Sequence, residues 1–271
     1  GGSVKYCSVS GTVWGTTNVG GILGYNRKMA TVENCLNTAA VKGNIRVGGI
    51  VGYNFSNADI EGCCNSGIIN ASSYVGGLVG TSSGSTVAHS YNKGTVNAEV
   101  NQAGGLIGYA AYGDIFGNYT LGSVNCPGEL TGIAFGNVIY LTNIYKCYYD
   151  KDNPPIPFND DFASPAEHVL MLDEIFVGTL NVERDIFVTD YFVVNDGYPI
   201  LRWQLDSWTG DQSEPATDGA GVYLIGNGSE LAWFAALVNG TLSGIPANPG
   251  ANARLTKDIL LNPDIFSETS N

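Results

Sequence analysis

The stretch VGGILGY begins at Val19, and close copies of it begin at Val47 (VGGIVGY), Val75 (VGGLVGT) and Ala103 (AGGLIGY). The copies are equally spaced, with a 28-residue period, and a degraded copy, TGIAFG, begins at Thr131 after the same interval. Recurrence at a fixed period of this length is the signature of a repeat protein. The fold therefore depends on what a unit of this length can form.

A second apolar pattern lies between these copies. Its marker residues each stand three positions before a small or polar residue, and they are Val4, Val32, Ile60, Val87, Ile115 and Ile144. Another apolar residue follows most of them nine positions later, so each repeat carries two strand-like units. The intervals between successive markers vary slightly, whereas those between the glycine units stay constant. This difference indicates that turns absorb changes in length while stacked strands keep their register.

The units are short, β-branched and bracketed by glycine, which argues against helical repeats with their 3.6-residue periodicity. A β-propeller blade needs about 40 residues and four strands, which is more than this repeat supplies. The composition agrees, with 37 glycines, two methionines and 14% charged residues. We therefore predict an all-β chain in which residues 1–149 form a parallel β-helix (β-solenoid) of about five coils, with stacked strands about 4.8 Å apart.

Two neighbouring aliphatic residues occupy the centre of each glycine unit, as Ile22 and Leu23 do in the first copy. Neighbouring residues of a regular strand point to opposite faces of the sheet. We therefore expect one face to fill the interior of the coil and the other to form an apolar stripe. Either another part of the molecule covers that stripe or it stays exposed.

The net charge of −13 is unevenly distributed along the chain. Up to Tyr149 there are seven Lys or Arg against six Asp or Glu, a net charge of +1, and from Asp150 onward five against 19, a net charge of −14. No basic cluster could neutralise a row of phosphates, so we expect neither nucleic acid nor an anionic membrane surface as a partner. An apolar run of about 18 residues is also absent, so we expect no membrane insertion. Gly1 does not begin a signal peptide, and we interpret the chain as a fragment.

Two short amphipathic helices are predicted after the repeats. Ser164, Pro165 and Glu167 have the spacing of a capping box with proline at the first helical position. Apolar residues then recur on one face, at Val169, Leu172, Phe176 and Leu180. A second helix is expected between Ser229 and Gly240. We expect residues 150–209 to form a C-terminal helical cap, because the last coil would otherwise expose apolar residues and unpaired strand edges.

The glycine units resemble a known family. The tetrads GILG, GIVG, GLVG and GLIG begin at Gly21, Gly49, Gly77 and Gly105 and end at Gly24, Gly52, Gly80 and Gly108. They resemble the GLUG motif, in which U is a bulky aliphatic residue and which is named from repeats in bacterial surface adhesins and immunoglobulin-A-cleaving peptidases. The resemblance covers residues 1–149. DGYPILRWQ from Asp196 resembles the segment that closes such regions, and residues 210–271 resemble the start of a second β-helix-like unit.

Stacked coils would place equivalent side chains in columns. One column contains Cys7, Cys35 and Cys63. No C-x-x-C pair is present, so we interpret these cysteines as inward-facing free thiols, with disulfides or a metal site as the less favoured alternatives. A second column contains Asn37, Asn65 and Asn92. We interpret it as a ladder of hydrogen-bonded amides at stacked turns, with ligand binding as the alternative.

Residues for catalysis or metal binding are sparse. His89 and His168 lie outside any H-E-x-x-H motif, so the zinc site of the peptidases is not in this chain. No G-x-S-x-G elbow and no phosphate-binding loop are present. Glu33 and Glu61 are equivalent in adjacent coils, and they have the separation of glycosidase carboxylates without a cleft lined by aromatic residues.

The acidic stretch after the repeats contains Asp150, Asp152, Asp160 and Asp161. Several carboxylates together suit calcium, but this stretch lacks a recognised loop spacing, and a solvated linker is the preferred interpretation. We predict no catalytic residue, no cofactor and no resident metal.

Tyr25, Tyr53 and Tyr109 follow the glycine unit at equivalent positions, and we predict that they line one outer face of the rod as a binding surface. The resemblance implies a non-enzymatic, extracellular scaffold or adhesion module of a larger bacterial surface protein, with host or matrix proteins or glycans as partners. We expect a monomer. The alternatives are a glycan-binding or glycan-active β-helix, such as a lyase or glycosidase, and an accessory region of a surface peptidase.

Overall fold

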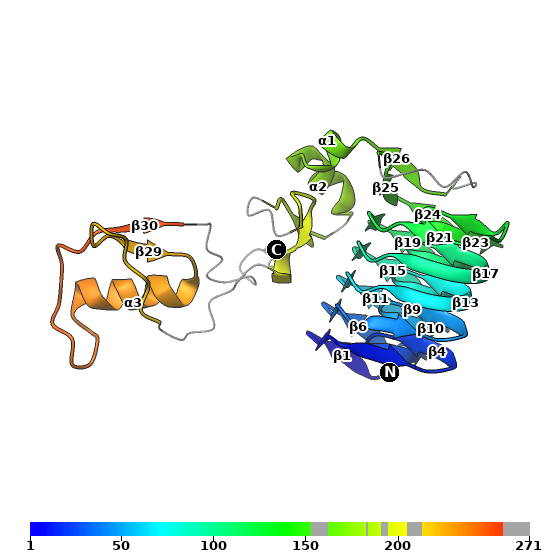
Figure 1. The fold of residues 1–271 in the computed structure, drawn as a ribbon, viewed down its shortest axis with the longest axis horizontal. Helices are drawn as coiled ribbons and strands as arrows, with labels where there is room; N and C mark the ends of the chain where they lie inside the picture. The colour runs from blue at the N-terminus through cyan, green and yellow to red at the C-terminus, as the bar shows by residue number, and fades with distance from the viewer. Residues whose placement is uncertain (153–161, 183, 191–194, 205–212, 257–271) are drawn as a thin grey trace, which may run out of the picture. The chain divides into compact units, whose positions relative to one another are not determined.

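The computed structural model describes residues 1–152, 162–182, 184–190, 195–204 and 213–256. The chain divides into two compact units. Unit 1 is formed by residues 1–190 and 195–199, and unit 2 by residues 191–194 and 200–271. Unit 1 contains a stack of coils, in which the chain climbs from β1 near the N-terminus to β25 and β26 (Figure 1).

The coils stack their strands into four sheets, named A to D. Sheet A contains β1 (Ser3–Lys5), β6 (Thr31–Glu33), β11 (Asp59–Glu61), β15 (Thr86–Ala88), β19 (Asp114–Phe116) and β24 (Asn143–Tyr145). Sheet B contains β2 (Ser8–Val9), β7 (Leu36–Asn37), β12 (Cys64–Asn65), β16 (Tyr91–Asn92), β20 (Tyr119–Thr120), β25 (Tyr148–Asp150) and β26 (Ser164–Ala166). Sheet C contains β3 (Thr12–Trp14), β4 (Thr17–Gly20), β8 (Ala40–Lys42), β9 (Ile45–Gly48), β13 (Ile69–Gly76), β17 (Val96–Gly104), β21 (Val124–Asn125) and β22 (Thr131–Gly132). Sheet D contains β5 (Leu23–Arg27), β10 (Val51–Phe55), β14 (Val79–Ser83), β18 (Ile107–Ala111) and β23 (Phe135–Ile139).

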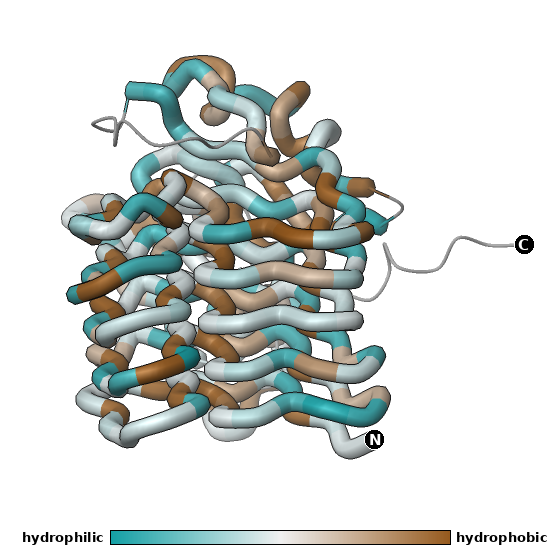
Figure 2. The backbone as a smooth tube through the Cα atoms, turned by 90° about the vertical axis from the view of Figure 1, so that its right-hand side faces the viewer, coloured by the Kyte–Doolittle hydropathy of each residue, from teal (hydrophilic) through white to brown (hydrophobic). Residues whose placement is uncertain are grey.

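Neighbouring strands of these sheets pair in parallel and in the register that the repeat predicts. Equivalent glycines form one column, because Gly20 pairs with Gly48, Gly48 with Gly76 and Gly76 with Gly104. Hydrophobic stretches recur one above another in successive coils (Figure 2). The prediction of an all-β parallel β-solenoid is therefore confirmed.

The two aliphatic residues at the centre of each glycine unit face the same interior, and the prediction of a second apolar stripe was wrong. The chain bends after β9, so Ile50 and Val51 are not neighbours on one regular strand. Both are fully buried in one cluster with Val32 of sheet A and with Cys35, which follows that strand. The equivalent pairs in the next two coils, Leu78 with Val79 and Leu106 with Ile107, are buried in the same cluster. A bend removes the alternation that a regular strand imposes, so these residues need no further cover.

The asparagine column forms a buried ladder. The Asn37 amide nitrogen donates to Asn65 Oδ1 at 2.7 Å, and the Asn65 amide nitrogen donates to Asn92 Oδ1 at 2.7 Å. Each side chain also bonds the backbone two residues later, as Asn65 does with Gly67. These asparagines lie on β7, β12 and β16, not at the stacked turns that the sequence suggested.

The first glycine of each tetrad packs against this asparagine ladder. A Cβ on Gly49 would lie 2.3 Å from the amide carbon of Asn65 and 2.2 Å from the carbonyl oxygen of Gly77. Gly21 and Gly77 meet the ladder in the same way, at Asn37 and Asn92. Side chains essentially never approach this closely in folded proteins, so only glycine fits beside the ladder.

The asparagine ladder ends one coil before the first tetrad glycine does. Thr120 takes the place of asparagine in the coil after Asn92, and Gly105 still packs against it. One coil further on, Tyr149 is paired with Thr120, and Ile133 stands where the tetrad glycine would be. A Cβ on Gly105 would lie 2.3 Å from the carbonyl oxygen of Ile133, so the backbone of the next coil excludes a side chain at this position as the ladder does.

Sheet B ends at a proline, and the capping box predicted at Ser164 was wrong. Ser164–Ala166 is strand β26, which pairs with β25, and Glu167 makes no side-chain capping bond. Ser164 N donates to Cys147 O and Lys151 N donates to Ala166 O, so these residues face β25 and Pro165 faces outward. Proline has no N–H to offer a further strand. Its role is therefore to close the sheet edge.

A C-terminal strap, defined as residues 168–182 and 184–190, covers the outer face of sheet B. It contains α1 (His168–Met171), α2 (Glu174–Leu180) and β27 (Phe187–Val188). Phe187 is fully buried against the stacked rings of Tyr91 and Tyr119, and Phe176 meets the Tyr119 and Tyr148 rings edge-on. The helix α2 begins at an N-cap, Asp173, whose side chain accepts from Ile175 N at 2.8 Å.

Unit 2 contains β28 (Ile200–Leu201), the 3-10 helix η1 (Arg202–Gln204), β29 (Tyr223–Ile225), α3 (Gly228–Asn239) and β30 (Ala253–Leu255). The predicted second helix is present, but its N-cap is Asn227 rather than Ser229. It stops at Gly240 in a left-handed conformation, as expected. The strands β29 and β30 pair in parallel. The boundaries at residues 149 and 209 and the second β-helix-like unit stay predictions.

The close approach of the first tetrad glycine to the asparagine ladder gives a stability prediction. Gly49→Ala should lower the free energy of unfolding by about 2 kcal/mol or more, because its methyl group overlaps a backbone carbonyl and a ladder amide. Gly178→Ala is the control, since nothing lies within 4 Å of its Cβ position on α2. Denaturant unfolding of both variants checks this, and equal stabilities would contradict it.

The strap gives a second prediction. Phe187→Ala should cost about 3–5 kcal/mol of strap docking, because a fully buried aromatic side chain is lost. Phe162→Ala removes a half-exposed phenylalanine and serves as the control. Limited proteolysis should cut the first variant faster within residues 168–190, and an unchanged rate would show that Phe187 does not hold the strap.

Candidate binding surface

The predicted tyrosines lie on the outer face of sheet D. Strand pairing places Tyr25 beside Tyr53, Tyr53 beside Thr81, and Thr81 beside Tyr109. The rings of Tyr25 and Tyr53 stack with centroids 5.1 Å apart and planes 14° apart. Thr81 interrupts the column, so Tyr109 does not stack on Tyr53.

Three further tyrosines at the corners beside sheet D extend this surface. Tyr74 meets the Tyr109 ring edge-on at 5.9 Å, and Tyr112 stacks on Tyr140 at 5.0 Å with planes 4° apart. All three have a left-handed backbone. The tyrosine face is defined as Tyr25, Tyr53, Tyr74, Tyr109, Tyr112 and Tyr140. Sequence reasoning missed the last pair although Tyr112 and Tyr140 are one repeat period apart, whereas Tyr74 has no tyrosine equivalent in the adjacent coils.

Two arginines lie on the tyrosine rings. The guanidinium carbon of Arg27 lies 5.5 Å from the Tyr25 centroid, and that of Arg46 lies 4.9 Å from the Tyr53 centroid. Burial raises the pKa of Tyr53 and outweighs the opposing charge of Arg46. Burial and the neighbouring tyrosines raise the pKa of Tyr109. These hydroxyls therefore stay protonated at neutral pH and can both donate and accept hydrogen bonds.

The cysteine column contains free thiols. Cys7 is exposed in the first coil, whereas Cys35 and Cys63 are buried in the main apolar cluster. The Cys63 thiol lies near the carbonyl oxygens of Val32 and Glu61. Burial raises the pKa of Cys63 well above its ordinary value, which leaves this thiol unreactive.

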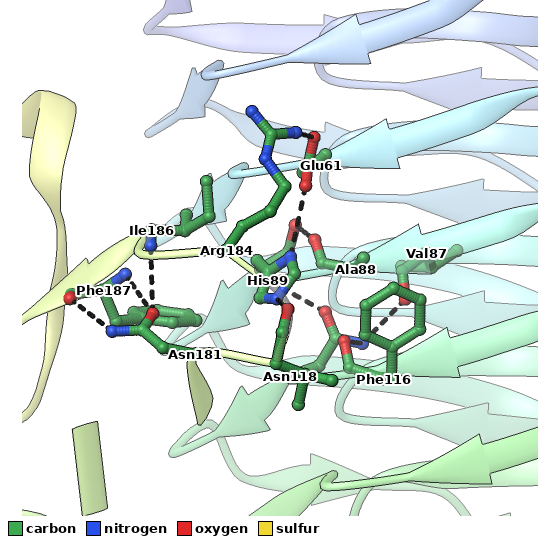
Figure 3. Close-up of polar contacts among 12 residues, drawn as sticks. Glu61, Val87, Ala88, His89, Phe116, Asn118, Asn181, Arg184, Ile186 and Phe187 are labelled. Atoms are coloured by element: carbon green, nitrogen blue, oxygen red, sulfur yellow. Dashed lines mark hydrogen bonds and ion pairs between the residues drawn. The ribbon is translucent and has the colours of Figure 1, made fainter. Parts of the chain in front are cut away.

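The carboxylates Glu33 and Glu61 are paired on neighbouring strands, as the sequence indicated, but different cations bind them. Lys5 Nζ lies 2.8 Å from Glu33. Glu61 Oε1 lies 3.2 Å from His89 Nδ1, and its other oxygen bonds Arg184 of the strap (Figure 3). His89 Nε2 lies 2.8 Å from the carbonyl oxygen of Val182. The buried His89 therefore joins sheet A to the strap, a role that the sequence did not reveal.

A polar hollow of about 360 Å³ lies beside the last coil. Tyr198 OH donates to Asp150, and His168 Nδ1 lies 3.1 Å from the same carboxylate oxygen. Burial alone would raise the pKa of Asp150, but the hydrogen bonds from Tyr198, the Asp152 backbone and His168 lower it. The Asp150 oxygens are therefore occupied by protein donors.

Metal ligands do not gather in the described part of the chain, where no group of three His, Cys, Asp or Glu side chains could hold an ion. The calcium candidates Asp160 and Asp161 lie outside the described residues. Among the residues that are described, no helix is long and apolar enough to span a bilayer.

The stacked coils define a repeat protein of the parallel β-helix class. Within that class, residues 71–97 match the family model described as the GLUG motif. This stretch contains the GLVG tetrad that begins at Gly77, and the match is consistent with a GLUG-motif repeat protein. Searches of curated proteins and of solved structures found no match.

The Glu61 contact predicts a pH dependence of strap docking. Burial alone would raise the pKa of Glu61, but His89 and Arg184 together lower it below the ordinary value of 4.5. A lowered pKa in the folded state adds stability above that ordinary value, and the added stability is lost as the pH falls through the lowered pKa.

Glu61→Gln should therefore weaken protection of residues 184–190 against hydrogen exchange at pH 7, and the difference from the wild type should shrink on acidification. Glu99→Gln is the control for the loss of one exposed carboxylate. A difference that stays constant from pH 7 to pH 3 would contradict this role of Glu61.

Proposed function

We propose that this chain is a non-catalytic scaffold and adhesion module of a larger bacterial surface protein, and that it acts outside the cell by binding a host or matrix protein or a glycan. The observation that carries the proposal is the tyrosine face. Large aromatic side chains are enriched at binding surfaces because they contribute contact area with few rotatable bonds. Tyr25, Tyr112 and Tyr140 are exposed.

The scaffold supports this role. Every coil is bonded to the next by parallel strand pairs, and the buried asparagine ladder adds side-chain bonds along the same direction. A surface built on such a rigid element loses little conformational entropy when a partner binds. The GLUG motif match agrees with a repeat module of a larger protein.

Catalysis has weaker support. Glu33 and Glu61 are neighbours, but Lys5 neutralises the first, and His89 and Arg184 bind the second. A glycosidase needs one carboxyl group that holds a proton near neutral pH, whereas the pKa of Glu61 is lowered. The arrangement therefore suits a structural link rather than a general acid.

Binding to immobilised polysaccharides and matrix proteins tests the proposal. Tyr53→Ala should weaken binding by about tenfold or more, as expected for an aromatic residue at the centre of a contact surface. Trp14→Ala removes a highly exposed aromatic residue from sheet C and should leave binding unchanged. Circular dichroism verifies that both variants fold.

Two results would contradict the proposal. One is binding that Tyr53→Ala and Trp14→Ala reduce equally. The other is release of reducing ends from a polysaccharide by the wild type but not by Glu61→Gln, which would favour a glycan-active enzyme.

A further inference from the structure

The surface around the tyrosine face carries charge of one sign only. It is built from residues 18–29, 46–57, 74–84, 102–112 and 130–140, which form sheet D and its two flanking corners. These stretches contain no Asp or Glu, and their charged residues are Arg27, Lys28 and Arg46. The whole chain has 25 acidic residues against 12 Lys and Arg, so a purely cationic surface is contrary to its composition.

The arginines are held in place without using their hydrogen-bonding capacity on a carboxylate. Arg27 and Arg46 lie over tyrosine rings, and within the described residues neither forms an ion pair with Asp or Glu. A guanidinium stacked on a ring keeps its N–H groups directed outward in its own plane. Such a group is ready to bind a carboxylate through two parallel hydrogen bonds.

The ring geometry favours hydroxyl contacts over ring stacking with a partner. Tyr25 and Tyr53 stack on each other, so the ring area between them is not available to a partner. Protonated tyrosine hydroxyls match the hydroxyl groups of a sugar, because each side can donate and accept. The surface therefore combines neutral hydroxyl partners with a few fixed cations.

We propose that the tyrosine face binds a carboxylated polysaccharide, a polymer that contains uronic acid sugars. This inference rests on the proposed binding function and names the ligand class. The coil spacing suits a polymer, since two coils rise about 9.6 Å, a step comparable to a disaccharide unit. Arg27 and Arg46 bind the carboxylates, and the tyrosine hydroxyls bind the sugar hydroxyls.

Other partners fit the surface less well. A neutral glycan would leave Arg27, Lys28 and Arg46 without counterions at the contact. A nucleic acid presents a continuous row of phosphates, for which three cations on a chain of net charge −13 are too few. A polymer with spaced carboxylates matches both the sparse positive charge and the hydroxyl-rich surface.

Binding to a matched panel tests the inference. The panel contains polygalacturonate, alginate and hyaluronate as carboxylated polymers, methyl-esterified polygalacturonate as the uncharged match, and dextran sulfate as a polyanion without carboxylates. Affinity electrophoresis of the whole chain should show binding to at least one carboxylated polymer, and about tenfold weaker binding to the ester and to dextran sulfate.

Charge variants identify the surface. Arg27→Gln with Arg46→Gln should weaken binding to the carboxylated polymer about tenfold or more. The control is Lys42→Gln with Lys146→Gln, which removes the same charge from exposed residues outside the tyrosine face and should stay within about twofold of the wild type.

The possible negative results distinguish a wrong ligand class from a wrong binding function. No binding to any carboxylated polymer, equal binding to the methyl ester, preference for dextran sulfate, or equal losses in both double variants would overturn the uronic acid assignment. If a matrix protein or neutral glycan still binds and Tyr53→Ala weakens that binding, the proposed function stands without this ligand class. Absence of any binding that depends on Tyr53 would remove both.

Discussion

The side-chain amide of Asn65 lies so close to the backbone of Gly49 that a methyl group on the glycine would meet the amide carbon at 2.3 Å. This contact recurs in successive coils, while the amides bond one another along the stack at 2.7 Å. A fully buried amide is favourable only when its hydrogen bonds are made, so each asparagine depends on its equivalents above and below. Gly105 still stands beside Thr120, and glycine is replaced by Ile133 one coil later, where Tyr149 follows Thr120. The first glycine of each tetrad is therefore required by two neighbours, the ladder side chain and the carbonyl oxygen of the next coil.

The ladder and the tetrad glycines lie inside the stack, so the residues on the outer faces of the sheets can differ from one sheet to another. Sheet B has an aromatic outer face that the strap buries, with Phe187 against the stacked tyrosines, and Arg184 of the strap also binds Glu61 of sheet A. Sheet D has an aromatic outer face that stays partly exposed, and Arg27 and Arg46 lie over two of its tyrosine rings. The two faces therefore differ, because the strap covers the first whereas Tyr25 on the second is exposed.

The repeat period and the columns could be predicted from the sequence because stacked parallel strands force equivalent residues into register. The bend that turns both Ile50 and Val51 toward the interior could not be predicted, since two consecutive glycines do not indicate at which residue the strand ends. Pro165 was misassigned because its position suits the start of a helix as well as the edge of a sheet. His89 and Arg184 were missed because their contacts join segments that lie far apart in the chain, as the separations of 93 and 123 show. Part of the tyrosine face followed from the repeat period, but Tyr74 and the arginine stacking depend on corner geometry that no local pattern encodes.

Two asparagines of the same coil test the central claim most directly. Asn65 belongs to the buried ladder, whereas Asn70 belongs to a partly exposed one, in which it accepts from Asn97 at 3.0 Å. Denaturant unfolding should show a loss of about 3 kcal/mol or more for Asn65→Ala, because several buried polar groups lose their partners, and less than about 1 kcal/mol for Asn70→Ala. Equal losses for the two variants would contradict the account that the buried ladder holds the coils together.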